Sequence, residues 1–147
     1  MARHTIVMDS ISLTAAQDLV RITGVSGFSV RSVTVRADVS EVSDKVMVGI
    51  YRASTLGTGT PTTALCYEDG SAQFAGTATT NLTVATTKLP LAPLVSTSVD
   101  LSGEGHAWAA MDGTDDIDVA GGNTVVVRLE SAPVGATVIT CVVEVEQ

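Results

Sequence analysis

The sequence is poor in aromatic residues, in cysteine and in positive charge. Only 3% of its 147 residues are Phe, Trp or Tyr, and two are cysteine. Lys and Arg number 8 against 16 Asp and Glu, which leaves a formal net charge of −8. Nucleic acids and anionic membrane surfaces are bound mainly through basic groups, which neutralise phosphates and acidic lipids. The charge therefore argues against both kinds of partner.

Long hydrophobic runs are also missing. The apolar stretches fall far short of the ~20 residues that a membrane-spanning helix needs. Residues 1–9 lack the apolar core of a secretory signal. No segment of helical length carries apolar residues at the i, i+3, i+4, i+7 spacing. We therefore expect a protein made in the cytoplasm, with little or no helix.

Catalytic and zinc-binding motifs are scarce as well. Ser26 lies in Gly-Val-Ser-Gly, but the nucleophile elbow Gly-x-Ser-x-Gly needs a glycine where Phe28 stands. The histidines, His4 and His106, and the two cysteines show no zinc spacing. We expect His4 in a mobile N-terminal segment and His106 at a surface or edge position. The sequence predicts no enzyme and no cofactor.

One acidic cluster is a weak candidate for a metal site. Four carboxylates fall close together, and they belong to Asp112, Asp115, Asp116 and Asp118. Ca²⁺ is bound through several oxygen ligands, many of them carboxylates. The spacing does not match an EF-hand loop. Two interpretations stay open, a Ca²⁺ site and a solvated acidic turn.

The sequence is rich in Val, Ala and Thr. β-branched residues favour pleated strands, and period-2 alternation recurs in runs bounded by Gly, Pro, Asn, Asp or Ser. The clearest runs are residues 28–37, 45–52, 96–101, 106–111, 123–130 and 136–146, and the weaker ones are residues 5–8, 17–23, 63–67, 79–85 and 86–89. These runs predict an all-β protein, either a sandwich or a barrel, in a single domain.

The patterning also predicts local features. The alternation that begins at Phe28 slips at Arg31-Ser32, which indicates a bulge. Residues 125–127 are all valine, so this strand is expected to be buried on both faces. Two stretches rich in Gly, Ser and Thr, residues 53–62 and 68–80, are predicted as long surface loops.

The two cysteines lie in strand-like contexts. Cys66 is in Ala-Leu-Cys-Tyr and Cys141 in Ile-Thr-Cys-Val-Val. Two buried free thiols are the favoured interpretation. A disulfide stays open, because the sequence does not give the distance between the two Cα atoms.

Three segments resemble the capsid decoration, or cement, proteins of tailed bacteriophages. They are SLTAAQDLVRIT (residues 12–23), YRASTLGTGT (residues 51–60) and VAGGNTVVVRL (residues 119–129), followed by the closing VEVE (residues 143–146). Residues 68–110 do not follow the family pattern. The resemblance implies a jelly-roll-like β-sandwich. We expect one such domain over residues 1–147, with residues 1–8 as an extended N-terminal arm.

The resemblance also implies a function. Such proteins attach to the outside of the virion and hold neighbouring subunits of the major capsid protein together, commonly as homotrimers and sometimes at two-fold positions. They carry no catalytic residues. Residues 1–67 hold six Lys and Arg against five Asp and Glu, whereas residues 68–147 hold two against eleven. We therefore expect the more basic half to face the capsid, with five candidate contacts, Arg3, Arg21, Arg31, Arg36 and Arg52.

A glycan- or receptor-binding module on the virion surface is the alternative. Sugar sites usually present an aromatic face, and this chain has five aromatic residues, Phe28, Tyr51, Tyr67, Phe74 and Trp108. Trp108 alternates with alanine, which favours a place in the core over a place in a sugar site.

Overall fold

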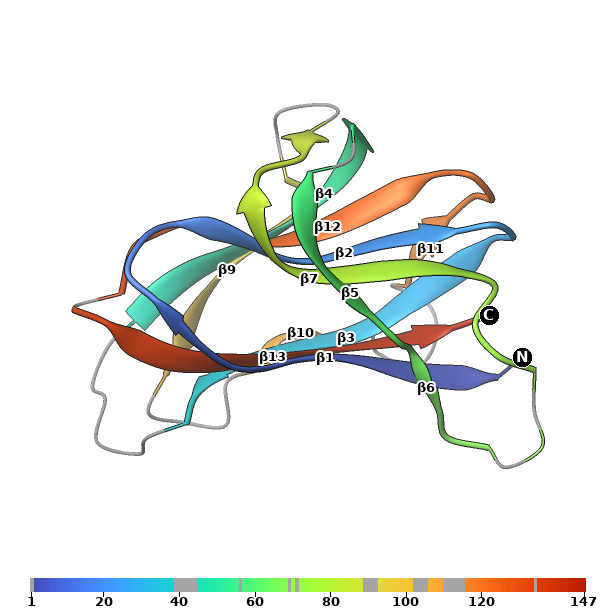
Figure 1. Ribbon diagram of the computed structural model, residues 1–147, viewed down its shortest axis with the longest axis horizontal. Coiled ribbons are helices and arrows are strands. Elements are labelled where there is room, and N and C mark those ends of the chain that lie inside the picture. Colours follow the sequence, from blue (N-terminus) through green and yellow to red (C-terminus); the bar gives the residue numbers. More distant parts are fainter. Residues whose placement is uncertain are drawn as a thin grey trace.

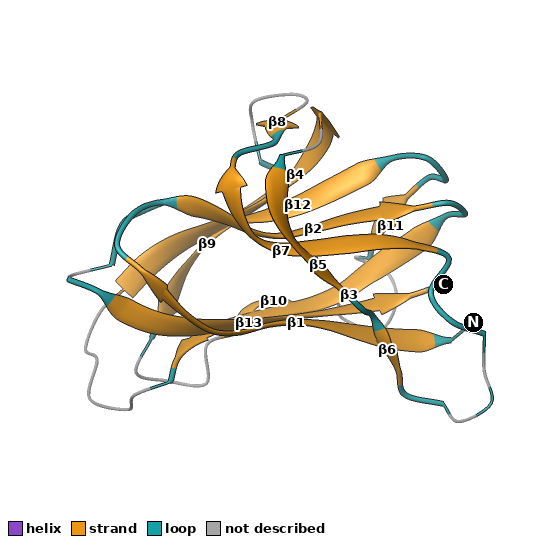
Figure 2. Ribbon diagram, in the orientation of Figure 1, coloured by secondary structure: helices purple, strands orange, loops and turns teal. Residues whose placement is uncertain are grey.

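The structure is a computed structural model, and it describes most of the chain. The described residues are 2–38, 45–55, 57–68, 70, 72–88, 93–101, 106–109, 116–133 and 135–147. Regular structure in these ranges consists of strands without a helix (Figure 2). Accordingly, no helix long and apolar enough to span a membrane occurs in them. The predicted all-β class is confirmed.

Thirteen strands make up the regular structure of the described residues. In chain order they are β1 (Arg3–Leu13), β2 (Gln17–Gly24), β3 (Phe28–Ala37), β4 (Lys45–Thr55), β5 (Thr58–Thr62), β6 (Leu65–Cys66), β7 (Gly76–Val84), β8 (Thr87–Lys88), β9 (Val95–Asp100), β10 (His106–Ala109), β11 (Ile117–Val119), β12 (Thr124–Leu129) and β13 (Thr137–Glu146). Each of the runs predicted from alternation contributes to one of these strands.

The strands form two antiparallel sheets that face each other (Figure 1). Sheet A has the order β10-β3-β13-β1-β6, with β11 also paired to β3. Sheet B has the order β5-β7-β2-β12-β4-β8, with β9 also paired to β4. The two layers make a sandwich-like arrangement, which confirms the sandwich alternative of the sequence prediction.

The core lies between the sheets and is built from alternate residues of each strand. In β13, Ile139, Cys141, Val143 and Val145 point inward and are fully buried. The intervening residues point to the outer face of sheet A and are mostly half-buried. Val, Ile and Leu side chains from both sheets complete one continuous cluster. Burial of this apolar surface is the main source of stability.

The predicted bulge in β3 is confirmed at Arg31. Glu144 of β13 pairs with Ser32, whereas the next residue, Val145, pairs with Val30, so Arg31 has no opposite residue. An extra residue in one strand shifts the alternation by one position. Val30 and Val33 therefore both point into the core although three positions separate them.

Sequence predictions for three segments were wrong. The predicted arm at residues 1–8 is not separate from the sandwich, because β1 pairs with β13 from Arg3 onward. Residues 53–62 are not a loop throughout, because they contain the end of β4 and the edge strand β5. Residues 68–80 are not a loop throughout either, because β7 begins at Gly76. Gly59 allows β5 to approach β7 closely, since a Cβ there would lie 2.7 Å from the Thr80 carbonyl oxygen. Pro61 is tolerated because β5 lies at the edge of its sheet.

The outer face of sheet B is partly covered by two segments of the chain. Gly57, between β4 and β5, accepts a hydrogen bond from Arg21 of β2 and lies against the carbonyl oxygen of Val84. The segment 84–88 then crosses toward β4, where β8 pairs with it. In Figure 1 the upper ends of β4, β5 and β7 rise together above the sheet. We call these two crossing segments, around residue 57 and at 84–88, the roof of sheet B.

Candidate functional site

The outer face of sheet A is open in the described part of the chain. Thr5 and Val7 of β1, Thr34 of β3, and Val142 and Glu144 of β13 are half-buried on it. Such partial exposure is typical of a sheet with one face on the core and the other toward solvent. This surface, which we call the open face, is the broadest candidate for contact with another protein.

Exposed apolar side chains lie at the β6 side of the open face. Leu65 pairs with Thr5 and is 62% exposed. Tyr67 is 59% exposed, its hydroxyl donates to Glu144 Oε1 at 3.0 Å, and its backbone N–H donates to the Arg3 carbonyl at 2.9 Å. The tyrosine ring is therefore held in place at the surface. Tyrosine and arginine are enriched among the residues that dominate protein interfaces.

Three of the five candidate arginines lie on the open face. Arg3 and Arg36 are exposed on β1 and β3. Arg31, at the bulge, forms ion pairs with Asp116 and, at 3.7 Å, with Glu146. Both of its acidic partners come from the second half of the sequence.

The other two arginines lie elsewhere, so the five do not form one surface. Arg21 is only 8% exposed, and its guanidinium donates to the Gly57 carbonyl and to Thr79 Oγ1 at 2.7 and 2.8 Å. Arg52 donates to the Asp118 carbonyl at 3.2 Å at one end of the sandwich. The expectation of a basic face from the first half is therefore wrong. Strands from both halves alternate within each sheet, which mixes their charges.

The described members of the acidic cluster contact different partners and not a shared site. Asp112 and Asp115 lie outside the described residues. Asp116 faces the Arg31 guanidinium, and Asp118 Oδ1 accepts a hydrogen bond from Ser29 at 2.6 Å. Among described residues, no group of three or more His, Cys, Asp or Glu side chains is arranged to hold a metal ion.

Both cysteines are free, as the favoured interpretation of the sequence predicted, but only Cys141 is also buried as expected. Cys141 is buried in β13, and burial raises its pKa to about 12. Cys66 is half-buried in β6. Ser26 lies in the bend between β2 and β3.

His4 is not in a mobile segment but in β1, where it is 1% exposed. Burial lowers the pKa of its imidazole, and Nδ1 has no hydrogen-bond partner. The backbones of His106 and Trp108 belong to β10, which pairs with β3. The side chains of these two residues lie outside the described part, so the expected core position of Trp108 stays a prediction.

A buried ionic cluster lies between sheet B and its roof. The Asp18 carboxylate is fully buried and accepts hydrogen bonds from Lys88 Nζ at 2.8 Å, from Arg128 at 3.0 Å and from the Thr86 backbone N–H at 2.7 Å. Burial by itself would raise the pKa of Asp18, but these hydrogen bonds outweigh it and hold the pKa below 3.8. Asp18 therefore joins the roof to β2 and β12.

Beside this cluster, Tyr51 is 7% exposed although it lies outside the main core. Burial and, to a lesser degree, a hydrogen bond with Glu130 raise its pKa to about 12. Tyr51, Lys88 and Arg128 line a pocket of about 310 Å³. Their polar atoms are largely used in contacts with Asp18 and Glu130. We therefore interpret this ionic cluster as stabilising the fold and not as a binding site.

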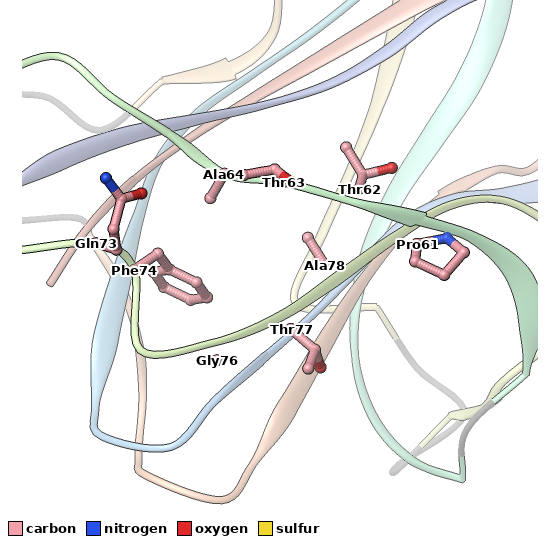
Figure 3. Close-up of a pocket in the computed structure, with 9 residues that line it drawn as sticks. All are labelled: Pro61, Thr62, Thr63, Ala64, Gln73, Phe74, Gly76, Thr77 and Ala78. Atoms are coloured by element: carbon pink, nitrogen blue, oxygen red, sulfur yellow. The ribbon is translucent and has the colours of Figure 1, made fainter.

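A second pocket lies where β5 separates from β7, and we call it the β5–β7 pocket. It has a volume of about 400 Å³. Phe74 lies between the 61–64 segment and β7, and the Ala78 methyl group points toward the same space (Figure 3). Sequence reasoning did not find this site, because residues 53–62 and 68–80 were both interpreted as loops.

Comparisons with known proteins return no match: no family model, no curated protein and no solved structure resembles the chain closely enough to identify it.

Proposed function

We propose that the chain is a structural virion protein that binds the outer surface of a phage capsid and stabilises contacts between major capsid protein subunits. The observation that carries the proposal is the open face of sheet A. It presents exposed Leu65 and Tyr67 next to exposed Arg3, and exposed Arg36 lies farther across the same face, on β3. This combination of apolar, aromatic and arginine side chains suits a protein partner.

The strand order supports a jelly-roll connectivity, which the resemblance to decoration proteins implies. In sheet A, β1, β13, β3 and β10 are neighbours in that order, and in sheet B, β2, β12, β4 and β9 are neighbours. Strands β1 to β4 therefore lie alternately in sheet A and sheet B. Near the end of the chain, β12 lies between β2 and β4, and β13 lies between β1 and β3. Two Greek keys in a double sheet define this class. Strands β5 to β8 are then an insertion.

A binding role on the capsid requires only modest affinity at each contact. When several copies bind one shell together, each further contact raises the effective concentration of the others. Self-association as a homotrimer, or as a dimer at a two-fold position, supplies such multivalency. The native mass of the purified protein tests this part of the proposal, because a strict monomer would contradict it.

The binding experiment compares the two outer surfaces. Capsids assembled without this chain are mixed with the wild-type protein, with the double variant Leu65→Asp/Arg36→Glu on the open face, or with Val84→Asp on the roof of sheet B. Val84 is 56% exposed and so is a matched control for Leu65. We expect cosedimentation to be lost only in the double variant. Loss in the roof variant alone would contradict the assignment of the open face.

A further inference from the structure

We propose that the β5–β7 pocket binds one ring of a neutral saccharide. This inference does not depend on capsid binding: the 61–64 segment leads directly into β6, but none of the residues that line the pocket is among those that define the open face. It rests on the size of the pocket, on the absence of charge among its described lining residues, and on the pairing of an aromatic floor with free polar groups.

The size and floor of the pocket suit a sugar ring. Its volume of about 400 Å³ falls within the range of about 300–1,000 Å³ that is usual for small-molecule sites. Phe74, Pro61, Ala64 and Ala78 supply apolar surface. The C–H face of a sugar is apolar and is commonly received by an aromatic ring, because its C–H groups complement the negative π face.

The position of Phe74 is fixed by its neighbours. Its ring meets His4 and Phe28 in T-shaped contacts, with centroid distances of 5.6 and 5.5 Å. Gly76 leaves room for it, because a Cβ at this position would lie 2.8 Å from the Phe74 ring and 2.2 Å from the Thr23 carbonyl oxygen. The floor of the pocket is therefore formed in advance of any ligand.

Polar groups that have no other partner complete the lining. Thr63 and Gln73 are exposed, and neither side chain makes a hydrogen bond in the described structure. A threonine hydroxyl and a glutamine amide both donate and accept hydrogen bonds, as the hydroxyl groups of a sugar do. These side chains suit a ligand that carries several hydroxyls.

The lack of charge selects a neutral ligand. Two other pockets of the described structure contain ionic side chains: Lys88 and Arg128 line the one beside Tyr51, and Arg52, Asp118 and Glu146 line one at Phe28. No described residue of the β5–β7 pocket is charged. An anionic sugar would lose its hydration there without gaining an opposite charge.

The test uses amide proton–nitrogen correlation spectra of the full chain. The probes are the methyl glycosides of glucose, galactose and mannose, together with N-acetylglucosamine, each added to tens of millimolar, and sialic acid is the charged comparator. We expect at least one neutral sugar to cause saturable shifts at residues 62–64 and 73–78, and sialic acid to cause none. The proposal is overturned if no neutral sugar shifts these signals or if sialic acid binds there equally well.

Variants decide whether the pocket itself binds. Thr63→Val/Gln73→Ala removes two free hydrogen-bonding groups, and we expect the affinity to fall about tenfold. Thr60→Val is the matched control, because Thr60 is a nearby exposed threonine, in β5, that does not line the pocket. Both proteins should keep the wild-type melting temperature. Unchanged affinity in the double variant would overturn the assignment.

Discussion

The outer faces of the two sheets differ in what covers them. On sheet B the roof covers buried side chains, among them Asp18, Tyr51 and Val126. On sheet A the outward side chains of β1, β3 and β13 are mostly half-buried or exposed, and Leu65 and Tyr67 extend from its β6 side. One outer face is thus used for folding, whereas the other is available to a partner.

The difference shows that the same strand pattern can serve two purposes. Val125, Val126 and Val127 are all buried, because β12 has the core on one side and the roof region on the other. β13 is also central in its sheet, yet its outer face carries Glu144 and Glu146. What lies over a strand, rather than its place in the sheet, decides whether its second face is apolar.

The largest expected effect is the loss of stability that follows when the Asp18 ionic cluster beneath the roof is disrupted. Asp18→Asn removes the carboxylate that Lys88 and Arg128 share. Removing one member of a buried ionic cluster leaves the others uncompensated, so we expect a loss of about 3 kcal/mol in the free energy of unfolding. Urea denaturation measures it.

The control for this variant is Asp9→Asn on β1, where the carboxylate is exposed. A surface change of this kind is expected to stay within about 0.5 kcal/mol. If both variants lost equal stability, the contrast between the two faces would be wrong.

The pH dependence of stability sharpens the same contrast. The pKa of Asp18 is lower in the folded protein than its ordinary value of 3.8. The ionised carboxylate therefore contributes stability that is fully present above about pH 4 and is lost as the pH falls through the lower folded value. Urea unfolding between neutral and acidic pH should show a smaller acid loss for Asp18→Asn than for wild type. Identical pH profiles would contradict the role of Asp18.

A smaller effect is expected from the ion pairs of the open face. Arg31→Gln breaks the contacts with Asp116 and Glu146, all of which are partly exposed. Solvent-accessible ion pairs contribute little, so the free energy of unfolding should fall by no more than about 1 kcal/mol. A loss as large as that of Asp18→Asn would show that the open face also carries structural charge.

The smallest perturbation is chemical labelling of the two thiols. Cys66 is half-buried on β6, whereas Cys141 points into the core and burial raises its pKa to about 12. Thiolates react and thiols do not, so we expect a maleimide to add once to the native protein and twice after denaturation. Mass spectrometry reads the number of adducts. Rapid double labelling of the native protein would show that sheet A opens.

Alternation in the sequence predicted the strands well where one face is buried. The β3 run was predicted at its observed bounds, and its bulge at Arg31 was visible as a slip in the pattern. The alternation of β13 separated its inward from its outward residues in the same way. In these strands the residues that face the core are apolar and those that face outward are mostly polar, so the sequence itself shows which way each side chain points.

Alternation did not predict β5, whose side chains are largely exposed, because nothing there requires an apolar residue at every second position. β5, with the sequence TGTPT, is an edge strand with few buried side chains, and its glycines and proline suggested a loop. The halves of the sequence differ in charge, but strands of both halves are neighbours in each sheet. The Asp18 cluster joins residues far apart in sequence, and the β5–β7 pocket is lined by segments that the sequence suggested to be loops, so no local signal marks either site.

An electron cryomicroscopy reconstruction of phage capsids mixed with this chain tests the proposed function most directly. We expect density for the sandwich at a symmetric site that bridges capsid subunits, with the open face of sheet A, including Leu65 and Tyr67, against the shell. A reconstruction in which the roof of sheet B contacts the shell, or in which the chain lies away from capsid subunits, would contradict the account.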